Sequence, residues 1–180
     1  MCIRDRAETA QSLECKLDVI IVAIGALEQP EKSIRDLSSV KFIDMFNANT
    51  IPTALIAKYF LPKLYRDRIT KFASISARVG SIEDNELGGW YSYRASKTAL
   101  NQIIKNFSIE VKRSNNNAIF VGLQPGTVKS YLSKPFEKNV KAENLFTPHY
   151  SAEKLLEVIN NLDKDDSGKI YACLLYTSPS

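Results

Sequence analysis

Runs of consecutive apolar residues alternate along the chain with longer segments in which apolar residues recur every three or four positions. Three runs are continuous and contain many β-branched residues, the pattern of strands buried on both faces of a sheet. They are residues 17–25 (LDVIIVAIG), 69–76 (ITKFASIS) and 118–123 (AIFVGL). A shorter run at 168–172 is predicted to be a fourth strand.

The segments between these runs have helical periodicity. Residues 33–63 and 91–113 form two predicted helices. A third is predicted to begin at Ser151, with Ser151 as its N-cap. Buried strands that alternate with helices of this length form parallel βαβ units, so the predicted fold is α/β, a doubly wound, Rossmann-like parallel sheet. Ligands of such sheets bind at the carboxyl ends of the strands.

The composition of the chain narrows the range of partners. Its 180 residues are 44% hydrophobic and 24% charged, which suits one globular domain, and the net charge is +4. The densest basic stretch, residues 63–71, is interrupted by Asp67, so a solvated helix end is favoured over nucleic-acid binding. The longest apolar run, residues 19–27, is too short to span a bilayer. We therefore expect a cytoplasmic protein that binds neither nucleic acid nor membrane.

Histidine and cysteine give no indication of a metal site. The cysteines Cys2, Cys15 and Cys173 have no metal-ligand spacing and suggest no disulfide framework. The single histidine, His149, has no clustered partner. We predict that the protein holds no metal ion.

Both ends of the chain look foreign to the rest. Residues 1–6 (MCIRDR) and 173–180 (CLLYTSPS) resemble translated sequencing-adapter sequence, although ordinary frayed termini are the alternative. On the first interpretation the domain covers residues 7–172. The seven glycines include no cluster before a helix, whereas a dinucleotide-binding sheet normally opens with one. Either the protein binds no dinucleotide or its first βαβαβ strands are missing, and the foreign-looking start favours the second interpretation.

A tyrosine and a lysine four positions apart lie on the same side of a helix. Such a pair can donate and accept protons, because a nearby cation is expected to lower the tyrosine pKa. The spacing alone is weak evidence, since it occurs three times, at Tyr59/Lys63, Tyr93/Lys97 and Tyr150/Lys154. The first pair straddles Pro62 and the third crosses the predicted helix start, so both are interpreted as surface or packing residues.

Several longer stretches resemble the short-chain dehydrogenase/reductase family, most closely its C-factor-like and sniffer-like carbonyl reductase branch. They are PEKS (30–33), NANTIP (47–52), SARVGSIEDNELGGWYSYRASKTALN (76–101), QPGTV (124–128), LSKPF (132–136) and LFTPHYSAEKLLEVI (145–159). The resemblance implies an NAD(P)-dependent oxidoreductase that interconverts a carbonyl and an alcohol, with NADP slightly favoured. It also implies a small-molecule substrate and, for the full-length protein, a homodimer or homotetramer.

The resemblance assigns roles to individual residues. Tyr93 would be the general acid/base, with Lys97 as its partner and as a ligand of the nicotinamide ribose. Asn49 would support them, since Pro52 is expected to bend the helix there and free backbone groups for a water relay to Lys97. Trp90, Tyr91 and Phe136 would line the substrate pocket, with simple aromatic packing as the alternative. The remaining cofactor-binding residues would be Gly25, Pro125, Gly126, Thr127, Val128 and Ser130.

Two departures from the family pattern complicate this assignment. The family usually has a serine three residues before the strand-end glycine, and that position is Ala77 here. Ser76, which ends the predicted strand, is our preferred source of the hydroxyl, with Ser81 as the alternative. In addition, residues 22–25 read Val-Ala-Ile-Gly where the family has Asn-Asn-Ala-Gly.

These departures keep a second function open, that of a non-catalytic signalling or scaffold protein with the same fold. We further expect that the 180 residues alone lack activity, bind NAD(P)H poorly and tend to aggregate. The reason is that the strand at 17–25 would be an uncovered, apolar edge.

Overall fold

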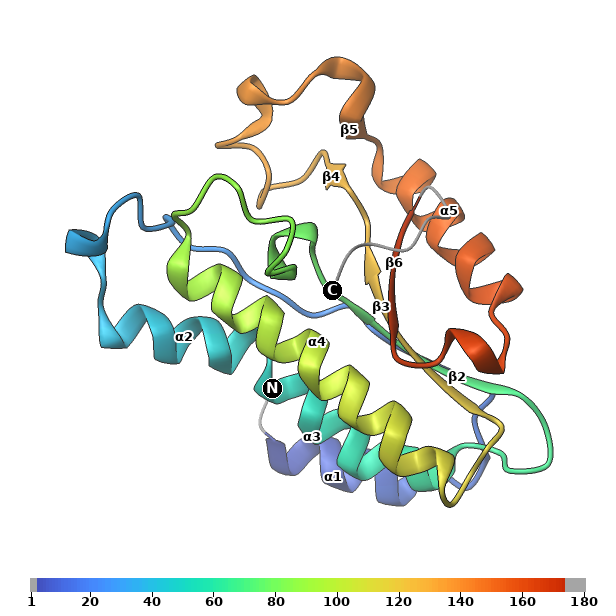
Figure 1. Ribbon diagram of the computed structural model, residues 1–180. Coiled ribbons are helices and arrows are strands. Elements are labelled where there is room, and N and C mark those ends of the chain that lie inside the picture. The colour runs from blue at the N-terminus through green and yellow to red at the C-terminus, as the bar shows by residue number, and fades with distance from the viewer. Residues whose placement is uncertain (1–2, 174–180) are drawn as a thin grey trace.

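The computed structural model describes residues 3–173, apart from the side chains of residues 3–7 and Asn139. A parallel sheet of four strands runs through its centre in the order β1-β2-β3-β6 (Figure 1). The strands are β1 (Val19–Val22), β2 (Thr70–Ile75), β3 (Ala118–Gln124) and β6 (Lys169–Ala172). The α/β fold with a parallel sheet that the apolar runs predict is thereby confirmed.

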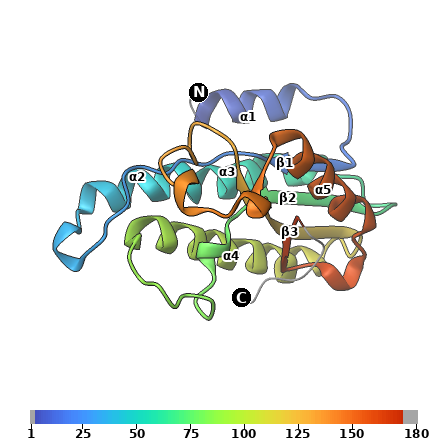
Figure 2. The same ribbon diagram turned by 90° about the horizontal axis from the view of Figure 1, so that it is seen from above.

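Helices cover both faces of the sheet, as a doubly wound arrangement requires (Figures 1 and 2). They are α1 (Ile3–Ser12), α2 (Ser39–Asn49), α3 (Ile51–Phe60), α4 (Tyr91–Lys112) and α5 (Pro148–Asn161). On one face α3 and α4 pack against the sheet, and α1 lies beside α3. On the other face α5 packs against β2 and β3. The predicted foreign N-terminal end, residues 1–6, overlaps the start of α1. The parts of the two predicted foreign ends at residues 1–2 and 174–180 lie outside the described part of the chain.

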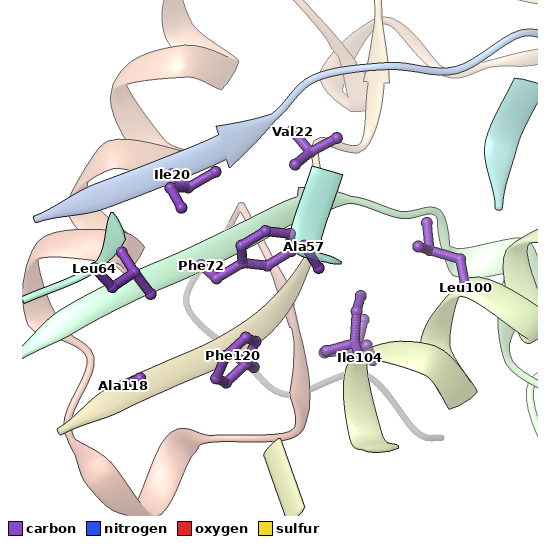
Figure 3. Packing of buried hydrophobic residues seen from close by; sticks show 10 residues of the cluster. Ile20, Val22, Ala57, Leu64, Phe72, Leu100, Ile104, Ala118 and Phe120 are labelled. Atoms are coloured by element: carbon purple, nitrogen blue, oxygen red, sulfur yellow. The ribbon is translucent and has the colours of Figure 1, made fainter. Parts of the chain in front are cut away.

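The core beneath α3 and α4 is built from alternate residues of the strands (Figure 3). Phe72 of β2 is fully buried, and its ring lies 5.6 Å from Phe120 of β3 and 6.2 Å from Phe107 of α4. Leu100 and Ile104 of α4 complete this layer. The same residues that anchor α4 to the sheet therefore fix the helix that carries Tyr93 and Lys97.

The predicted helix at 33–63 is divided in the structure. A short 3-10 turn at Ile34–Asp36 is followed by α2, which ends at Asn49, and by α3, which begins at Ile51. The division falls where Pro52 has no N–H to donate to the carbonyl of Ala48. The expected bend therefore exists, but it separates two helices.

The start of α5 differs from the prediction. Thr147, not Ser151, is the N-cap, and its hydroxyl accepts a hydrogen bond from the Tyr150 N–H. Pro148 occupies the first turn, where its missing N–H costs nothing. Ser151 lies inside the helix and its hydroxyl donates to the Pro125 carbonyl at 3.0 Å. The predicted N-cap is wrong because threonine and serine can both cap a helix. Proline favours the first helical position, and it is Thr147 that Pro148 follows.

Two further features were not predicted. A second, two-stranded parallel sheet joins β4 (Thr127–Val128) to β5 (Leu145–Phe146) beyond the end of β3. In addition, the first main strand is limited to Val19–Val22, and Leu17 forms a separate parallel bridge with Leu64. None of the helices in the described part of the chain has both the length and the apolar character needed to cross a membrane.

Strand β1 is an edge of the sheet, and we expect it to promote self-association. Val19 and Ile21 are 42% and 45% exposed, because they point to the face on which α5 covers only the neighbouring strands. An exposed apolar edge pairs readily with another chain. Ile21→Lys should therefore increase the monomeric fraction in size-exclusion chromatography with light scattering. Ile34→Lys, at an exposed site outside the strands, is the control. Equal association of Ile21→Lys and the wild type would contradict this account.

Candidate active site

Tyr93 and Lys97 lie one turn apart near the beginning of α4. The Lys97 Nζ atom is 6.0 Å from the centre of the Tyr93 ring, and it donates a hydrogen bond to the Ile75 carbonyl at 3.0 Å. Because Ile75 is the last residue of β2, this bond places the ammonium at the carboxyl end of the sheet. Lys97 is only 3% exposed. The pair thus lies at the edge of the sheet where ligands of this fold bind.

Burial dominates the electrostatics of this pair. It raises the pKa of Tyr93 to about 12 and lowers the pKa of Lys97 to about 8, since each charged form would lose its hydration. The expectation that Lys97 lowers the Tyr93 pKa is therefore wrong for the structure as it stands. Desolvation outweighs the attraction of the ammonium. At neutral pH Tyr93 is a neutral phenol and Lys97 is mostly protonated.

Asn49 ties the end of β1 to α4. Its side chain makes two hydrogen bonds with the backbone of Ala26, accepting from the N–H at 2.8 Å and donating to the carbonyl at 3.0 Å. Its Nδ2 also donates to the Ser96 hydroxyl at 3.1 Å, and that hydroxyl donates to the Tyr93 carbonyl at 2.8 Å. Asn49 therefore fixes the chain after Gly25 relative to the turn that carries Tyr93.

The break between α2 and α3 gives a second connection to α4. The Thr50 hydroxyl donates to the Ser96 carbonyl at 2.7 Å. Both residues are buried, and Ser96 lies between the two candidate catalytic residues in the sequence. Sequence reasoning missed Ser96 and Thr50, because these bonds join positions 46 and 47 residues apart and leave no local pattern.

Gly25 lies against Asn49 and the Lys97 ammonium, where a side chain would be crowded. A Cβ at this position would lie 3.2 Å from Asn49 Oδ1 and 3.4 Å from Lys97 Nζ. The residue itself is exposed. Of the predicted cofactor residues, Gly25 and Tyr93 thus both lie close to Lys97.

The turn after β3 lies at the same edge of the sheet as Lys97. Gly126 has a φ of 72°, a conformation that favours glycine. Thr127 and Val128 belong to β4, which pairs with β5. Pro125 is held by Ser151, and Ser130 forms hydrogen bonds with Ser133. The structure thus builds an ordered turn from all five predicted residues.

The serine candidates are directed elsewhere. The Ser76 hydroxyl donates to Asn101 Oδ1 at 2.6 Å, and Asn101 lies two turns, about 12 Å, beyond Tyr93 along α4. The Ser81 hydroxyl accepts from the Asp84 N–H at 3.1 Å. For Ser76 to bind a substrate carbonyl beside Tyr93, its bond to Asn101 would have to break.

Aromatic side chains border Tyr93. The Trp90 ring centre lies 6.1 Å from that of Tyr93 and 4.8 Å from that of Phe136. Trp90 and Phe136, which the sequence indicated as possible pocket residues, are thus brought together with Tyr93. Tyr91 makes no ring contact among the described residues.

The other two tyrosine–lysine pairs are engaged on the surface. Lys63 donates to the Leu13 carbonyl at 2.7 Å, and Lys154 forms an ion pair with Glu157. Tyr150, in the first turn of α5, packs on Phe146 of β5. The interpretation of both pairs as surface or packing residues agrees with these contacts. Among residues 3–173 no cluster of three or more side chains could bind a metal ion.

The family of the chain follows from comparison with known proteins. A family model described as short chain dehydrogenase matches residues 3–141. The chain belongs to the short-chain dehydrogenase family. This result confirms the resemblance inferred from the motif-bearing stretches.

Two curated relatives are similar to this chain in sequence over most of its length. The 1-hydroxy-2-glutathionyl-2-methyl-3-butene dehydrogenase of Rhodococcus sp. (strain AD45) is 29% identical over 154 residues, which cover 86% of this chain and 64% of the relative. C-signal of Myxococcus xanthus is 28% identical over 138 residues, which cover 75% of this chain and 78% of the relative. The chain thus spans less than two thirds of the Rhodococcus protein.

Solved short-chain dehydrogenase structures share the fold closely. The carbonyl reductase Sniffer of D. melanogaster superposes with a TM-score of 0.87 at 21% identity, and the NADPH-bound carbonyl reductase from chicken fatty liver with 0.87 at 23%. Both alignments cover 99% of this chain and 74% of the other. Because both identities are below 25%, these two structures show only that the fold is shared.

Asn49 is expected to be a major determinant of stability near the site. Asn49→Ala removes both bonds to Ala26 and the bond to Ser96, and leaves polar groups without partners. We expect a loss of about 2–4 kcal/mol in the free energy of unfolding. Asn47→Ala, at an exposed position on the same helix, is the matched control. Urea denaturation measures both, and equal losses in the two variants would contradict the role of Asn49.

Proposed function

We propose that the protein is an NAD(P)-dependent oxidoreductase that interconverts a carbonyl and an alcohol, with Tyr93 as general acid/base. The observation that carries the proposal is the buried Tyr93–Lys97 pair at the carboxyl end of β2, with Gly25 close to the Lys97 ammonium. Family membership supports it. So do a relative named as a dehydrogenase and a structural neighbour named as a carbonyl reductase. The neighbour is NADPH-bound, and NADP is therefore our proposed cofactor.

The properties of the pair suit proton transfer at an oxygen. With a pKa of about 12, Tyr93 holds its proton at neutral pH and can give it to a carbonyl oxygen that gains charge during reduction. The Lys97 ammonium stabilises the phenolate that remains. In the reverse direction the phenolate takes the proton of the alcohol. Asn49 keeps the chain at Gly25 and the first turn of α4 in register.

The nicotinamide cofactor would supply or accept the hydride. Lys97 and Tyr93 would hold its ribose beside Gly25. Its carboxamide would meet the turn formed by Pro125, Gly126, Thr127, Val128 and Ser130. Ser76 remains our proposed source of a substrate-binding hydroxyl, and the Ser76–Asn101 bond is the barrier to that role.

A carbonyl panel tests the proposal. The complete gene product and the 180-residue chain are each incubated with NADPH or NADH and with aliphatic and aromatic aldehydes and ketones. We expect cofactor oxidation with at least one carbonyl for the complete protein, and weak cofactor binding and no turnover for the chain alone. A complete protein that oxidises neither cofactor with any carbonyl would contradict the proposal.

A non-catalytic signalling or scaffold role is the second candidate. It is favoured by Ala77, which provides no hydroxyl, and by the engagement of Ser76 with Asn101. The similarity to C-signal is compatible with it. Tight nucleotide binding without turnover in the carbonyl panel would favour this role over catalysis.

We also propose that the complete protein binds a small-molecule substrate and forms a homodimer or homotetramer through α2 and α4. Val40 and Ile43 on α2 and Ile109 on α4 are at least half exposed, which supports apolar pairing there. Sedimentation analysis of the complete protein tests this proposal, and a monomer would contradict it. The cytoplasmic location stays a prediction.

A further inference from the structure

The backbone enters α4 in an unusual way. Gly88, Gly89 and Trp90 have φ angles of 64°, 64° and 54°, so three consecutive residues are in the left-handed region. For Trp90, which has a Cβ, this conformation costs about 1–2 kcal/mol. Trp90 is also the N-cap, and its side chain accepts no hydrogen bond from the first turn. Another group must therefore hold this turn in place.

Glu31, in the loop between β1 and α2, supplies these contacts. Its backbone carbonyl accepts a hydrogen bond from the Trp90 N–H at 2.7 Å. Its carboxylate Oε2 accepts from the Ser92 N–H at 3.4 Å. Glu31 is only 1% exposed, and its other oxygen, Oε1, is buried without a hydrogen-bond partner among the described residues. Glu31, 61 positions before Ser92, thus performs the capping that Trp90 does not.

The carboxylate of Glu31 is charged at neutral pH. Burial acts to raise its pKa, but hydrogen bonds from Ser92 and the charge of Lys41 act together in the opposite direction and leave the pKa below its ordinary value. A negative charge at this place is favourable, because the N-terminal end of a helix carries partial positive charge. Glu31 is therefore a charged cap and not a neutral packing residue.

The capped turn is the one that carries the candidate acid/base. Ser92 immediately precedes Tyr93, and the Trp90 ring packs against the rings of Tyr93 and Phe136. Loss of the Glu31 carboxylate leaves the Ser92 N–H without its acceptor, and of these contacts only the Glu31 backbone bond and the ring packing then hold Trp90 in its strained conformation. The rings of Trp90 and Tyr93 would then move with the first turn of α4.

We propose that Glu31 is a positioning residue for Tyr93: its buried carboxylate caps α4 across the fold and fixes the Trp90–Tyr93 turn. The part of this inference that concerns turnover rests on the proposed function, whereas the part that concerns the position of Tyr93 does not. No local pattern in the sequence points to this role, since Glu31 lies 59 residues before Trp90 in the stretch PEKS.

The test compares Glu31→Ala, Glu31→Gln and the control Glu28→Gln, an exposed glutamate of the same loop. The probes are amide hydrogen exchange at Ser92, the NMR signal of the Tyr93 ring and the fluorescence of Trp90, the only tryptophan of the chain. In Glu31→Ala we expect Ser92 exchange to be about tenfold faster. We also expect a shifted Tyr93 signal and a changed Trp90 emission. Glu31→Gln keeps an acceptor and should lie between Glu31→Ala and wild type, and Glu28→Gln should match wild type.

The carbonyl assay adds a kinetic readout on the complete protein. We expect kcat of Glu31→Ala to fall about tenfold while KM for the cofactor stays constant. Unchanged Ser92 exchange and Tyr93 signal in Glu31→Ala would overturn the proposal. If Glu31→Ala does not fold, wild-type values in Glu31→Gln would overturn it. A wild type without turnover would instead contradict the proposed function, and the NMR and fluorescence results would still decide the role of Glu31.

Discussion

Tyr93→Phe is expected to reduce carbonyl turnover by the complete protein about 10²–10⁴-fold, because it removes the only proposed proton donor and leaves the ring in place. The ring contacts with Trp90 should persist, so the free energy of unfolding should change little. KM for the cofactor should rise far less than kcat falls, because Lys97 still holds the proposed ribose site. The loss should therefore appear in kcat, which steady-state kinetics of NAD(P)H oxidation measures.

Tyr59→Phe is the matched control for this change. It removes the hydroxyl of the tyrosine in a second pair with the same four-residue spacing, whose lysine is engaged with Leu13. We expect it to retain full activity. If Tyr93→Phe were as active as Tyr59→Phe, Tyr93 would not be the acid/base and the assignment would fail.

Lys97→Met is expected to remove a rise in stability that the wild type shows between pH 8 and pH 10. The pKa of Lys97 is lowered by burial from 10.5 to about 8. Between these values the unfolded state binds more protons at this residue than the folded state. The free energy of unfolding therefore increases with pH, by about 1.4 kcal/mol per pH unit. Over the whole window this difference is on the order of 2–3 kcal/mol.

Urea denaturation at pH 7, 8, 9 and 10 measures this effect as the difference between variant and wild type. Taking the difference matters, since the raised pKa values of Tyr93 and Cys173 oppose the rise in both proteins. Lys58→Met, at an exposed position, is the control and should follow the wild-type curve. Parallel curves for Lys97→Met and wild type would show that Lys97 is not desolvated.

The main elements of the fold are predictable because each depends on its own residues. The runs at 69–76 and 118–123 predict strands buried on both faces, and β2 and β3 are largely buried in this way. The run at 17–25 also contains a strand, but β1 buries only one face and leaves Val19 and Ile21 exposed at the edge of the sheet. The stripe on residues 91–113 predicts α4 almost to the residue. The division between α2 and α3 is harder to predict from the sequence, because a proline such as Pro52 can either bend a helix or end it. The outcome depends on the packing around Thr50.

The residues of the candidate site also differ in how far the sequence predicts their arrangement. Tyr93 and Lys97 share a helix, so their proximity follows from the spacing, and family-like stretches distinguish them from the two other pairs. Other contacts join segments that are distant in the sequence, and no local pattern predicts them. They are the hydrogen bonds of Asn49 with Ala26 and Ser96 and the cap that Glu31 provides to α4. The sequence also predicts the wrong direction for the Tyr93 pKa, because it shows the neighbouring charge but not the burial that raises this pKa.

The most direct test of the central claim follows the hydride into the product. The complete protein is incubated with a carbonyl that it turns over and with NAD(P)H carrying deuterium at the transferred position, and the alcohol is examined by mass spectrometry and NMR. We predict one deuterium on the carbinol carbon for wild type and for Tyr59→Phe, and almost no product for Tyr93→Phe. Labelled alcohol formed at the wild-type rate by Tyr93→Phe, or cofactor binding with no labelled alcohol in any protein, would contradict the account.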